Sequence, residues 1–198
     1  MSPIRWFNKL ESTNDEARRR FSGLDNLSVV ACRNQTAGRG QGDHTWYSPA
    51  GRNLTFSIVF KYEGMPLDAP DAALVSSFVT LGILDYLRDK GVEGRIKWPN
   101  DIWIADRKIC GILVENTIEN NFVTGSIIGV GFNLNERIWP PELPNPVSLL
   151  ELTGKRRCPA LELRRLVKKI CRRSRLLSDA DGRKVLQEEF GKYVFRIS

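Results

Sequence analysis

The sequence predicts an α+β fold in which helices flank a mixed β-sheet. Short strand-like runs cluster between residues 95 and 135, whereas long helical patterns lie before and after them without regular alternation. The 198 residues are 41% hydrophobic and 27% charged, which is typical of a globular protein with a sizeable core. No repeat, low-complexity segment or long linker interrupts them, so we expect a single domain over residues 1–198.

The sequence of the N-terminal half predicts three strands and two helices. The strands are expected at residues 4–10, 27–34 and 53–60. Thr13 and Glu16 fit the S/T-x-x-E capping box and predict a helix beginning there. Residues 71–91 read as a long, mostly buried helix that ends at Gly91.

The C-terminal half predicts further strands, followed by helices. The strands are expected at RIKW (95–98), DIWIA (101–105), KICGILVEN (108–116) and FVTGSIIGVGFNLN (122–135). ADRK, at residues 105–108, predicts the tight turn of a hairpin. In residues 154–177 apolar side chains recur at helical spacing and predict an amphipathic helix with a basic outer face: Leu163, Leu166, Val167 and Ile170.

The net charge of +7 and the pI near 9.4 favour anionic partners in general. The basic face around residues 155–175 is most simply a solvated helix surface. The alternative is a docking surface for an acidic protein or for nucleic acid. The stretch lacks aromatic side chains that could stack on bases, which argues against single-stranded nucleic acid.

Several features favour a cytoplasmic protein without a membrane partner. No apolar run approaches the roughly 20 residues of a membrane span. The N-terminus has no basic region followed by an apolar one, so we do not expect secretion. Cys32, Cys110, Cys158 and Cys171 are too scattered to indicate zinc or a disulfide framework, and we expect reduced, mostly buried thiols.

The stretch QTAGRGQGDHTW, residues 35–46, holds three glycines beside an arginine. Glycine lets a ligand approach the backbone closely, although a glycine-rich stretch is also common in ordinary surface loops. The guanidinium of Arg39 suits a phosphate or a carboxylate. Gly38 and Gly40 leave their backbone free to form an anion-binding nest, so we expect this loop to wrap an anionic ligand.

Five motifs follow one another along the chain: ESTN (11–14), QTAGRGxxxxxW (35–46), KWPND (97–101), RKICGILVE (107–115) and GVGFNLN (129–135). In this order they resemble the biotin–protein ligases, over nearly the whole chain from Ile4 to about Tyr193. The resemblance implies a catalytic domain of the class II aminoacyl-tRNA synthetase and biotin ligase type. It also implies an enzyme that uses ATP and Mg²⁺ to convert biotin to biotinyl-5'-AMP, releasing pyrophosphate. Biotin then passes to a lysine of the biotin carboxyl carrier domain of a carboxylase such as acetyl-CoA carboxylase.

The same resemblance implies the site residues, with Arg39 and Lys108 as the catalytic cations. Biotin and the adenylate would contact Ser12, Thr13, Asn14, Gln35, Gly38, Arg39, Gly40, Gln41, Trp46, Lys108, Gly111, Ile112 and Asn133. ATP would contact Lys97, Asn100 and Asp101, and Mg²⁺ would arrive with the nucleotide without direct protein ligands.

Simpler roles stay open for several of these residues. Thr13 fits a helix cap, Lys108 a solvated residue after a turn, and Trp46 a core tryptophan at the start of a strand. Lys97 fits a strand residue that reaches solvent, with Ile96 and Trp98 on the opposite face.

The chain departs from the family pattern in the glycine-rich loop. Many relatives carry a basic residue in place of Gln41, and Asp43 and His44 leave the loop less positive still. Losing a charged hydrogen bond costs about 1 kcal/mol or more, so we expect the adenylate to be released faster. His44 is interpreted as a loop residue and not as a catalytic base.

The resemblance also implies expectations about neighbouring domains and assembly. The chain starts at the catalytic domain, without the helix-turn-helix domain through which some relatives bind DNA, so we expect no operator binding. It stops at KYVFRIS, where relatives begin a small SH3-like domain, which indicates either truncation or a lineage without that domain. We expect a monomer or a weak homodimer.

Two rival functions are weighed against this one. A lipoate– or octanoate–protein ligase would share the fold and the adenylation chemistry, but it would give the polar residues Ser12–Asn14 and Gln35 little to recognise. A basic nucleic-acid-binding module would explain the charge but leave KWPND and KxxGIL without a role.

Overall fold

The structure is a computed structural model that describes residues 3–62, 64 and 66–196. The chain forms two compact units. Unit 1 comprises Met1–Ala73 and Ile112–Gly131, and unit 2 comprises Leu74–Gly111 and Phe132–Ser198. Parallel and antiparallel strand pairs coexist, which confirms the predicted α+β fold with a mixed sheet. The expectation of a single domain stays a prediction.

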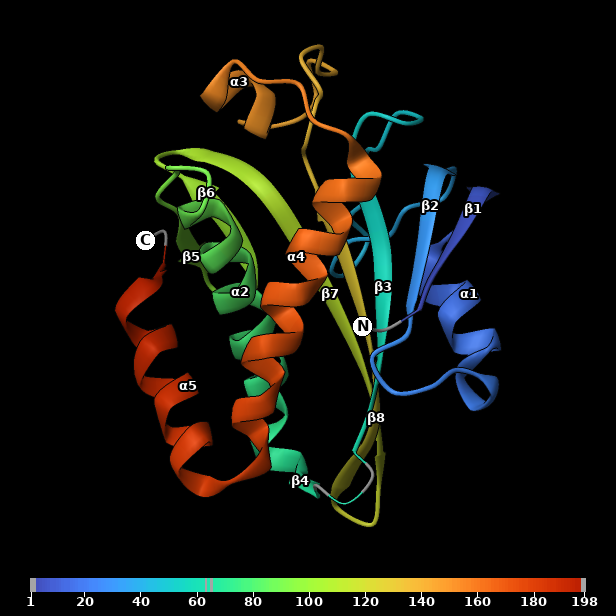
Figure 1. Cartoon of the computed structure of the whole chain (residues 1–198), viewed down its shortest axis with the longest axis vertical. Helices are drawn as coiled ribbons and strands as arrows, with labels where there is room; N and C mark the ends of the chain where they lie inside the picture. The colour runs from blue at the N-terminus through green and yellow to red at the C-terminus, as the bar shows by residue number, and fades with distance from the viewer. Residues whose placement is uncertain (1–2, 63, 65, 197–198) are drawn as a thin grey trace. The chain divides into compact units, whose positions relative to one another are not determined.

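Unit 1 is built from strands and one short helix. Its elements are β1 (Ile4–Leu10), α1 (Thr13–Arg19), η1 (Phe21–Gly23), β2 (Val29–Gln35), β3 (Leu54–Lys61), β4 (Leu67–Asp68), η2 (Ala69–Ala72) and most of β7 (Arg107–Glu119) and β8 (Phe122–Phe132). The strands follow the order β1-β2-β3-β8-β7, with β4 paired to β8. β1 and β2 are parallel, and Figure 1 shows α1 beside them. The three predicted N-terminal strands are therefore confirmed.

The core of unit 1 joins α1 to the sheet. Buried apolar side chains from α1, from the residue after η1 and from three strands pack together: Ala17, Leu24, Val30, Val59 and Ile127. Phe21 also packs on this cluster, and a Cβ at Gly125 would lie 2.5 Å from its ring. The absence of a side chain at Gly125 therefore makes room for the aromatic ring.

The predicted helix start is shifted by one residue. Ser12, and not Thr13, is the N-cap of α1, and its hydroxyl accepts a hydrogen bond from the Asp15 amide. Glu16 does not complete a capping box, because its carboxylate pairs with Arg19 and Arg20 one turn later. The capping-box interpretation was wrong because Ser12 and Thr13 both offer a hydroxyl, and the motif matches only the second.

Unit 2 carries the long helices. Its elements are α2 (Ala73–Arg88), β5 (Arg95–Lys97), β6 (Asp101–Ile104), the start of β7, α3 (Leu149–Thr153), α4 (Pro159–Ser174), η3 (Arg175–Ser178), α5 (Ala180–Tyr193) and β9 (Val194–Phe195). The strands follow the order β7-β6-β5-β9. The β6–β7 hairpin is confirmed, with a positive φ of 50° at Ala105 in its turn.

The helices of unit 2 pack closely. A Cβ at Gly82 of α2 would lie 2.7 Å from the Cα of Ile170, so glycine lets the backbones of α2 and α4 approach each other. Arg173 of α4 binds Glu189 of α5, and the three helices lie in one group in Figure 1. The predicted basic amphipathic helix is confirmed: Leu163, Leu166 and Ile170 are fully buried.

Some expectations about burial were wrong. By length and composition alone, residues Ala69–Arg88 are apolar enough to cross a membrane, although 67% of their most apolar window is buried within the fold. All four cysteines are free thiols, but only Cys32 and Cys110 are buried, and Cys158 is exposed. Trp98 lies beyond the end of β5 and is 54% exposed, so it does not share a buried strand face with Ile96.

Candidate functional site

The predicted site residues fall into both units. Unit 1 holds Ser12, Thr13, Asn14, Gln35, Gly38, Arg39, Gly40, Gln41, Trp46 and Ile112. Unit 2 holds Lys97, Asn100, Asp101, Lys108, Gly111 and Asn133. The first set is mostly uncharged, whereas the second contains three charged side chains.

A buried polar cluster lies at the start of α1. The Ser57 hydroxyl, fully buried on β3, is hydrogen-bonded to the Thr13 hydroxyl at 2.8 Å and to the Asn14 amide oxygen at 2.6 Å. Thr13 and Asn14 are each 3% exposed. Burying polar groups is favourable only when they are hydrogen-bonded, and these groups are paired with one another. The cluster is therefore fixed by the protein itself.

Gln35, at the end of β2, extends this cluster. Its side-chain oxygen accepts a hydrogen bond from the Thr13 amide at 2.8 Å, which fixes the orientation of its amide group. The two N–H donors of that group form no hydrogen bond with the residues described between 3 and 196. They are available to a ligand that presents an oxygen acceptor.

Ser57 and Gly129 were missed by the sequence analysis. Ser57 is a single small polar residue in an apolar strand, which by itself favours no role. Gly129 belongs to the GVGFNLN motif, yet its function is steric, since a Cβ there would lie 2.4 Å from the Asn14 side-chain oxygen. Only the fold brings these residues to Asn14.

The glycine-rich loop forms a small hairpin. The Trp46 amide donates to the Gly38 carbonyl at 2.9 Å, and the Gly40 amide donates to the His44 carbonyl at 2.6 Å. Gly42 has a positive φ of 62° at the tip. A Cβ at Gly38 would lie 2.6 Å from the Trp46 carbonyl oxygen. The close approach of the two arms of the hairpin therefore explains the glycine there. The expected nest is contradicted at Gly40, because its amide is already used within the hairpin.

Arg39 belongs to a group of alternating charges. Its guanidinium binds Asp15 at 2.7 Å and Glu115 at 3.3 Å, and Arg18 binds the same two carboxylates at 2.9 and 2.6 Å. Two cations and two anions balance, and Arg39 is 44% exposed. An incoming phosphate or carboxylate would therefore exchange with Asp15 or Glu115 for this guanidinium. Glu115 also accepts a hydrogen bond from Asn14 at 2.7 Å, which links this group to the buried cluster.

The remaining loop residues differ in burial. Trp46 is half-buried and its ring packs directly on Gly131, where a Cβ would lie 2.1 Å from the indole. No strand begins at Trp46, so the packing against the loop and β8 replaces the expected strand-end position. Gln41 and His44 are exposed near the hairpin tip, in agreement with a loop role for His44.

In unit 2, Lys108 and Asp101 form an ion pair. The Lys108 ammonium lies 2.6 Å from the Asp101 carboxylate, and the side chains are 31% and 25% exposed. Asp101 faces Lys97 in the β5–β6 register, and the Lys97 ammonium lies 4.6 Å from the centroid of the Trp103 ring. Lys108 is therefore neither fully solvated nor buried, and its position is fixed by a carboxylate.

Asn133 supports the backbone of Lys108. Its side-chain amide donates to the Lys108 carbonyl at 3.3 Å, and its own amide donates to the Ile109 carbonyl at 2.9 Å. The Lys108 amide donates to the Asn145 carbonyl at 2.7 Å. Asn133 is 4% exposed, so its observed contacts position the lysine-bearing strand. Asn100 lies half-buried in the turn before Asp101, and Gly111 lies further along β7.

Cys110 lies two residues beyond Lys108 and is fully buried. Burial raises the pKa of its thiol well above the usual range, and the negative charge of Asp101 raises it further. The thiol therefore stays protonated at neutral pH and is a poor nucleophile. In the described part of the chain, no group of three or more His, Cys, Asp or Glu side chains is arranged to hold a metal ion.

Comparison with known proteins places this geometry in a family. Residues 6–133 match the Biotin/lipoate A/B protein ligase family. The chain is 36% identical to the bifunctional ligase/repressor BirA of Salmonella typhimurium over 129 residues, which are 65% of this chain and 39% of that protein. It is 32% identical to the biotin--[acetyl-CoA-carboxylase] ligase of Paracoccus denitrificans over 150 residues, 74% of this chain and 62% of that protein. The chain thus spans about two fifths of the length of BirA.

A solved structure supports the fold assignment. The biotin protein ligase from Aquifex aeolicus in complex with biotin and ATP superposes with a TM-score of 0.84. The match covers 98% of this chain and 79% of that one at 21% sequence identity, which shows a shared fold. Because the family match spans well over half of its residues, this chain belongs to the biotin/lipoate A/B protein ligase family, and the relatives described above are biotin–protein ligases.

Proposed function

We propose that this chain is a biotin–protein ligase. In the first step a biotin carboxylate oxygen attacks the α-phosphorus of ATP, so that biotinyl-5'-AMP forms and pyrophosphate leaves. In the second, a lysine amine of a carrier domain attacks the biotinyl carbonyl, an amide forms, and AMP leaves. The proposal rests on the family membership and on the relatives' names, because the chain spans only part of those relatives.

The observation that favours biotin is the buried uncharged cluster of Thr13, Asn14 and Ser57, with the half-buried amide of Gln35 at its edge. Biotin's ureido ring presents one strong acceptor and two donors, all of which need partners in a dry site. The cluster supplies hydroxyls, a fixed amide oxygen and the unused N–H donors of Gln35. Lipoate and octanoate have no such ring, and the unused N–H donors of Gln35 would then lack an acceptor, at a cost.

Positive charge is the second requirement of the reaction. The carboxylate and the triphosphate repel each other, so cations must offset their charge as the new bond forms. We assign this role to Arg39 and Lys108. Each is held by a carboxylate of its own unit, Asp15 for Arg39 and Asp101 for Lys108. A preoriented cation loses little freedom when the anionic substrate replaces its partner.

The residues around Asp101 fit a nucleotide-bound Mg²⁺ better than a resident one. One carboxylate oxygen of Asp101 is taken by Lys108, which leaves few hard oxygen ligands beside Asn100. Magnesium commonly keeps water and substrate phosphates as most of its ligands. We therefore assign Lys97, Asn100 and Asp101 to the ATP side. When bound, the ion would neutralise phosphate charge.

The acceptor, the compartment and the assembly remain predictions within this proposal. The Paracoccus relative is named for acetyl-CoA carboxylase, so the carrier domain of such a carboxylase is the first acceptor to test. We also retain the cytoplasmic location and the monomer or weak homodimer as predictions.

Pyrophosphate release tests the proposal directly. The 198-residue chain is incubated with Mg-ATP and, separately, with biotin, lipoate or octanoate. Release that depends on biotin alone is the expected result. Release with lipoate or octanoate in place of biotin would overturn the substrate and leave the adenylation chemistry. Biotin binding by calorimetry without any release would show that this length of chain recognises biotin but does not complete the reaction.

A further inference from the structure

Helix α4 carries two parallel rows of cations, offset by one residue. The first, the paired row, consists of Arg165, Lys169 and Arg173. The second, the open row, consists of Arg164, Lys168 and Arg172. Within each row the residues are four apart, so they lie one above another on one side of the helix.

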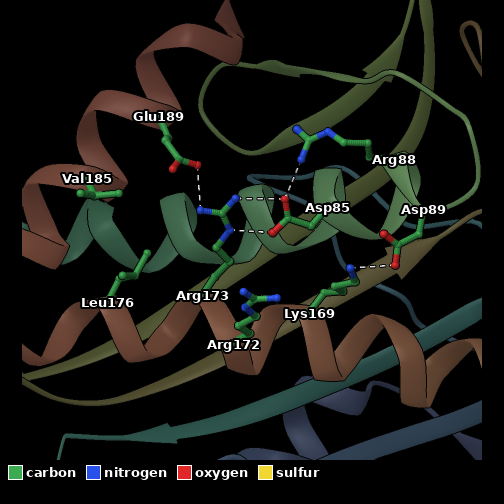
Figure 2. A pocket seen from close by; sticks show the side chains of 9 residues that line it. All are labelled: Asp85, Arg88, Asp89, Lys169, Arg172, Arg173, Leu176, Val185 and Glu189. Carbon is green, nitrogen blue, oxygen red and sulfur yellow. Dashed lines mark hydrogen bonds and ion pairs between the residues drawn. The ribbon is translucent and has the colours of Figure 1, made fainter.

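Every cation of the paired row has a carboxylate partner: Glu162 of α4 itself for Arg165, and carboxylates in or just after neighbouring helices for Lys169 and Arg173. The Lys169 ammonium lies 2.7 Å from Asp89, and the Arg173 guanidinium lies 2.7 Å from both Asp85 and Glu189 (Figure 2). Burial alone would raise the pKa of Asp85, but the hydrogen bonds and charge of Arg173 lower it below its usual value. Lys169 and Arg173 hold α4 against α2 and α5, so the charges of this row are already used within the fold.

The open row has no such partners. Arg164, Lys168 and Arg172 are exposed, and none forms a hydrogen bond or ion pair with any residue in the described ranges 3–62, 64 and 66–196. In Figure 2, Arg172 lies beside Arg173 but makes no marked contact. Arg175, exposed at the start of η3, continues the same run of charge. Like charges four residues apart repel each other and destabilise a helix, so the fold gains nothing from this row.

The spacing of the open row suits a regular polyanion. A helix rises about 1.5 Å per residue, so successive cations are about 6 Å apart along α4. Phosphates of one strand of duplex DNA recur about every 3.4 Å along its axis, so alternate phosphates recur at about 7 Å. Arg164, Arg172 and Arg175 carry guanidinium forks that bind phosphate through two parallel hydrogen bonds.

Other anionic partners fit less well. A specific protein interface has an apolar or aromatic centre, whereas the exposed apolar side chain of α4, Leu161, stands at one end of the row. A membrane surface would need an apolar helix face to insert, and the apolar face of α4 is buried around Leu166. Single-stranded nucleic acid would need aromatic platforms, which the sequence of this helix lacks.

We propose that the open row of α4, extended by Arg175, is a docking surface for the phosphate backbone of duplex nucleic acid. Binding is electrostatic and reads no bases, so it does not require a helix-turn-helix domain. The inference goes beyond the proposed ligase function and is independent of it, because it uses no residue assigned to biotin or ATP.

Fluorescence anisotropy with an unrelated-sequence DNA duplex of about 20 base pairs tests this. Four phosphate contacts predict a slope of log affinity against log salt of about −3.6, or about a 100-fold loss between 50 and 200 mM salt. A variant carrying Arg164→Gln, Lys168→Gln, Arg172→Gln and Arg175→Gln should bind at least about tenfold more weakly at 50 mM salt, with a slope near zero.

The matched control removes four exposed cations elsewhere: Arg5→Gln, Lys9→Gln, Lys184→Gln and Lys192→Gln. Both variants lower the formal net charge from +7 to +3, so long-range attraction falls equally. The control should keep most of the wild-type slope, and equal thermal midpoints verify folding. An equal loss in the control would overturn the proposal, as would absence of duplex binding by the wild type. Tighter binding of single-stranded DNA or of poly-glutamate through the open row would overturn it as well.

Discussion

Two groups of candidate site residues, one in each unit, satisfy their polar atoms in opposite ways. In unit 1, Thr13, Asn14 and Ser57 are uncharged, buried, and satisfied by hydrogen bonds to one another. In unit 2, Lys108 and Asp101 are charged, about a quarter to a third exposed, and satisfied by one ion pair. A buried neutral group cannot form replacement hydrogen bonds with water, whereas a partly exposed ion pair can.

In the proposed function, this difference suits the neutral cluster of unit 1 to recognition, and the partly exposed cations Lys108 and Arg39 to charge stabilisation. Because the neutral cluster pairs its own groups, the unused N–H donors of Gln35 at its edge are the groups that would select a ligand with a polar ring. An ion pair that water can reach exchanges partners at little cost, so it is suited to receiving an anion that forms during the reaction. Breaking the first should alter stability and selectivity, and breaking the second should alter rate.

The largest effect is expected at the charged side. Lys108→Gln removes the ammonium while its amide can still donate to Asp101. We expect pyrophosphate release with biotin to fall by about 100- to 1000-fold, as for loss of one transition-state donor. Biotin binding, measured by calorimetry without ATP, should change little. Lys9→Gln, at an exposed position, is the control and should release pyrophosphate at the wild-type rate.

The next effect is expected in the neutral cluster. Gly129→Ala would place a Cβ 2.4 Å from the Asn14 side-chain oxygen, in a region with no space to yield. Overpacking of this kind costs about 1–3 kcal/mol, which urea unfolding measures. Gly191→Ala is the matched control, because a Cβ there meets nothing within 4 Å in helix α5 and should leave stability equal or higher. Equal stability of the two variants would contradict the packing argument.

Removing one hydroxyl tests the hydrogen bonds of the cluster without crowding it. Ser57→Ala leaves the Thr13 hydroxyl and the Asn14 oxygen without their shared partner. We expect a loss of about 1–2 kcal/mol in the free energy of unfolding, with the same value at pH 3 and pH 7. A loss that varied with pH would mean that an ionisable group, and not these neutral ones, carries the effect.

In unit 2, by contrast, the contribution of the Asp85–Arg173 pair to stability should depend on pH. Burial alone would raise the pKa of Asp85, but Arg173 lowers it below the ordinary value of 3.8. The pair therefore stabilises the fold above pH 3.8, and this contribution is lost as pH falls through the lower folded value. Asp85→Asn should cost up to about 1 kcal/mol at pH 6 and progressively less below pH 4 in urea unfolding. If the cost of Asp85→Asn in the free energy of unfolding were the same across that pH range, the charge of Asp85 would not be its cause.

The main helices and strands could be predicted from the sequence because they depend on local patterns, whereas the candidate residues were implied by a family resemblance and stay a prediction. Alternating and helical apolar periodicity located the strands from Ile4 to Phe60 and the buried face of α4. The proposed chemistry was implied by the resemblance of five ordered motifs, KWPND and the glycine-rich loop among them, to the biotin–protein ligases. Element boundaries were less certain: Ser12 and Thr13 compete to cap α1, and only the backbone geometry shows that Ser12 does so.

Pairings between distant residues could not be predicted. Ser57 lies more than 40 residues from Asn14 in the chain, and Glu115 lies 76 from Arg39, so no local spacing connects them. The loop glycines were expected to receive an anion, whereas Gly38 makes room for the Trp46 backbone and Gly40 closes a hairpin. Residue type suggested what these groups can do, and the fold determined their partners.

The smallest predicted effect concerns the exposed tip of the loop. Gln41 is exposed beside Gly42, at the end of the hairpin that carries Arg39. Gln41→Arg adds one cation there without disturbing the carboxylate pairs of Arg39 or the neutral cluster. An exposed charge contributes at most about 1 kcal/mol, so we expect biotinyl-5'-AMP to be released up to about fivefold more slowly. Release is followed by trapping the free adenylate, with Gln41→Met as the uncharged control of similar length. Unchanged release in the arginine variant would show that the loop tip does not contact the intermediate, and retention would then depend on Arg39 and the buried cluster alone.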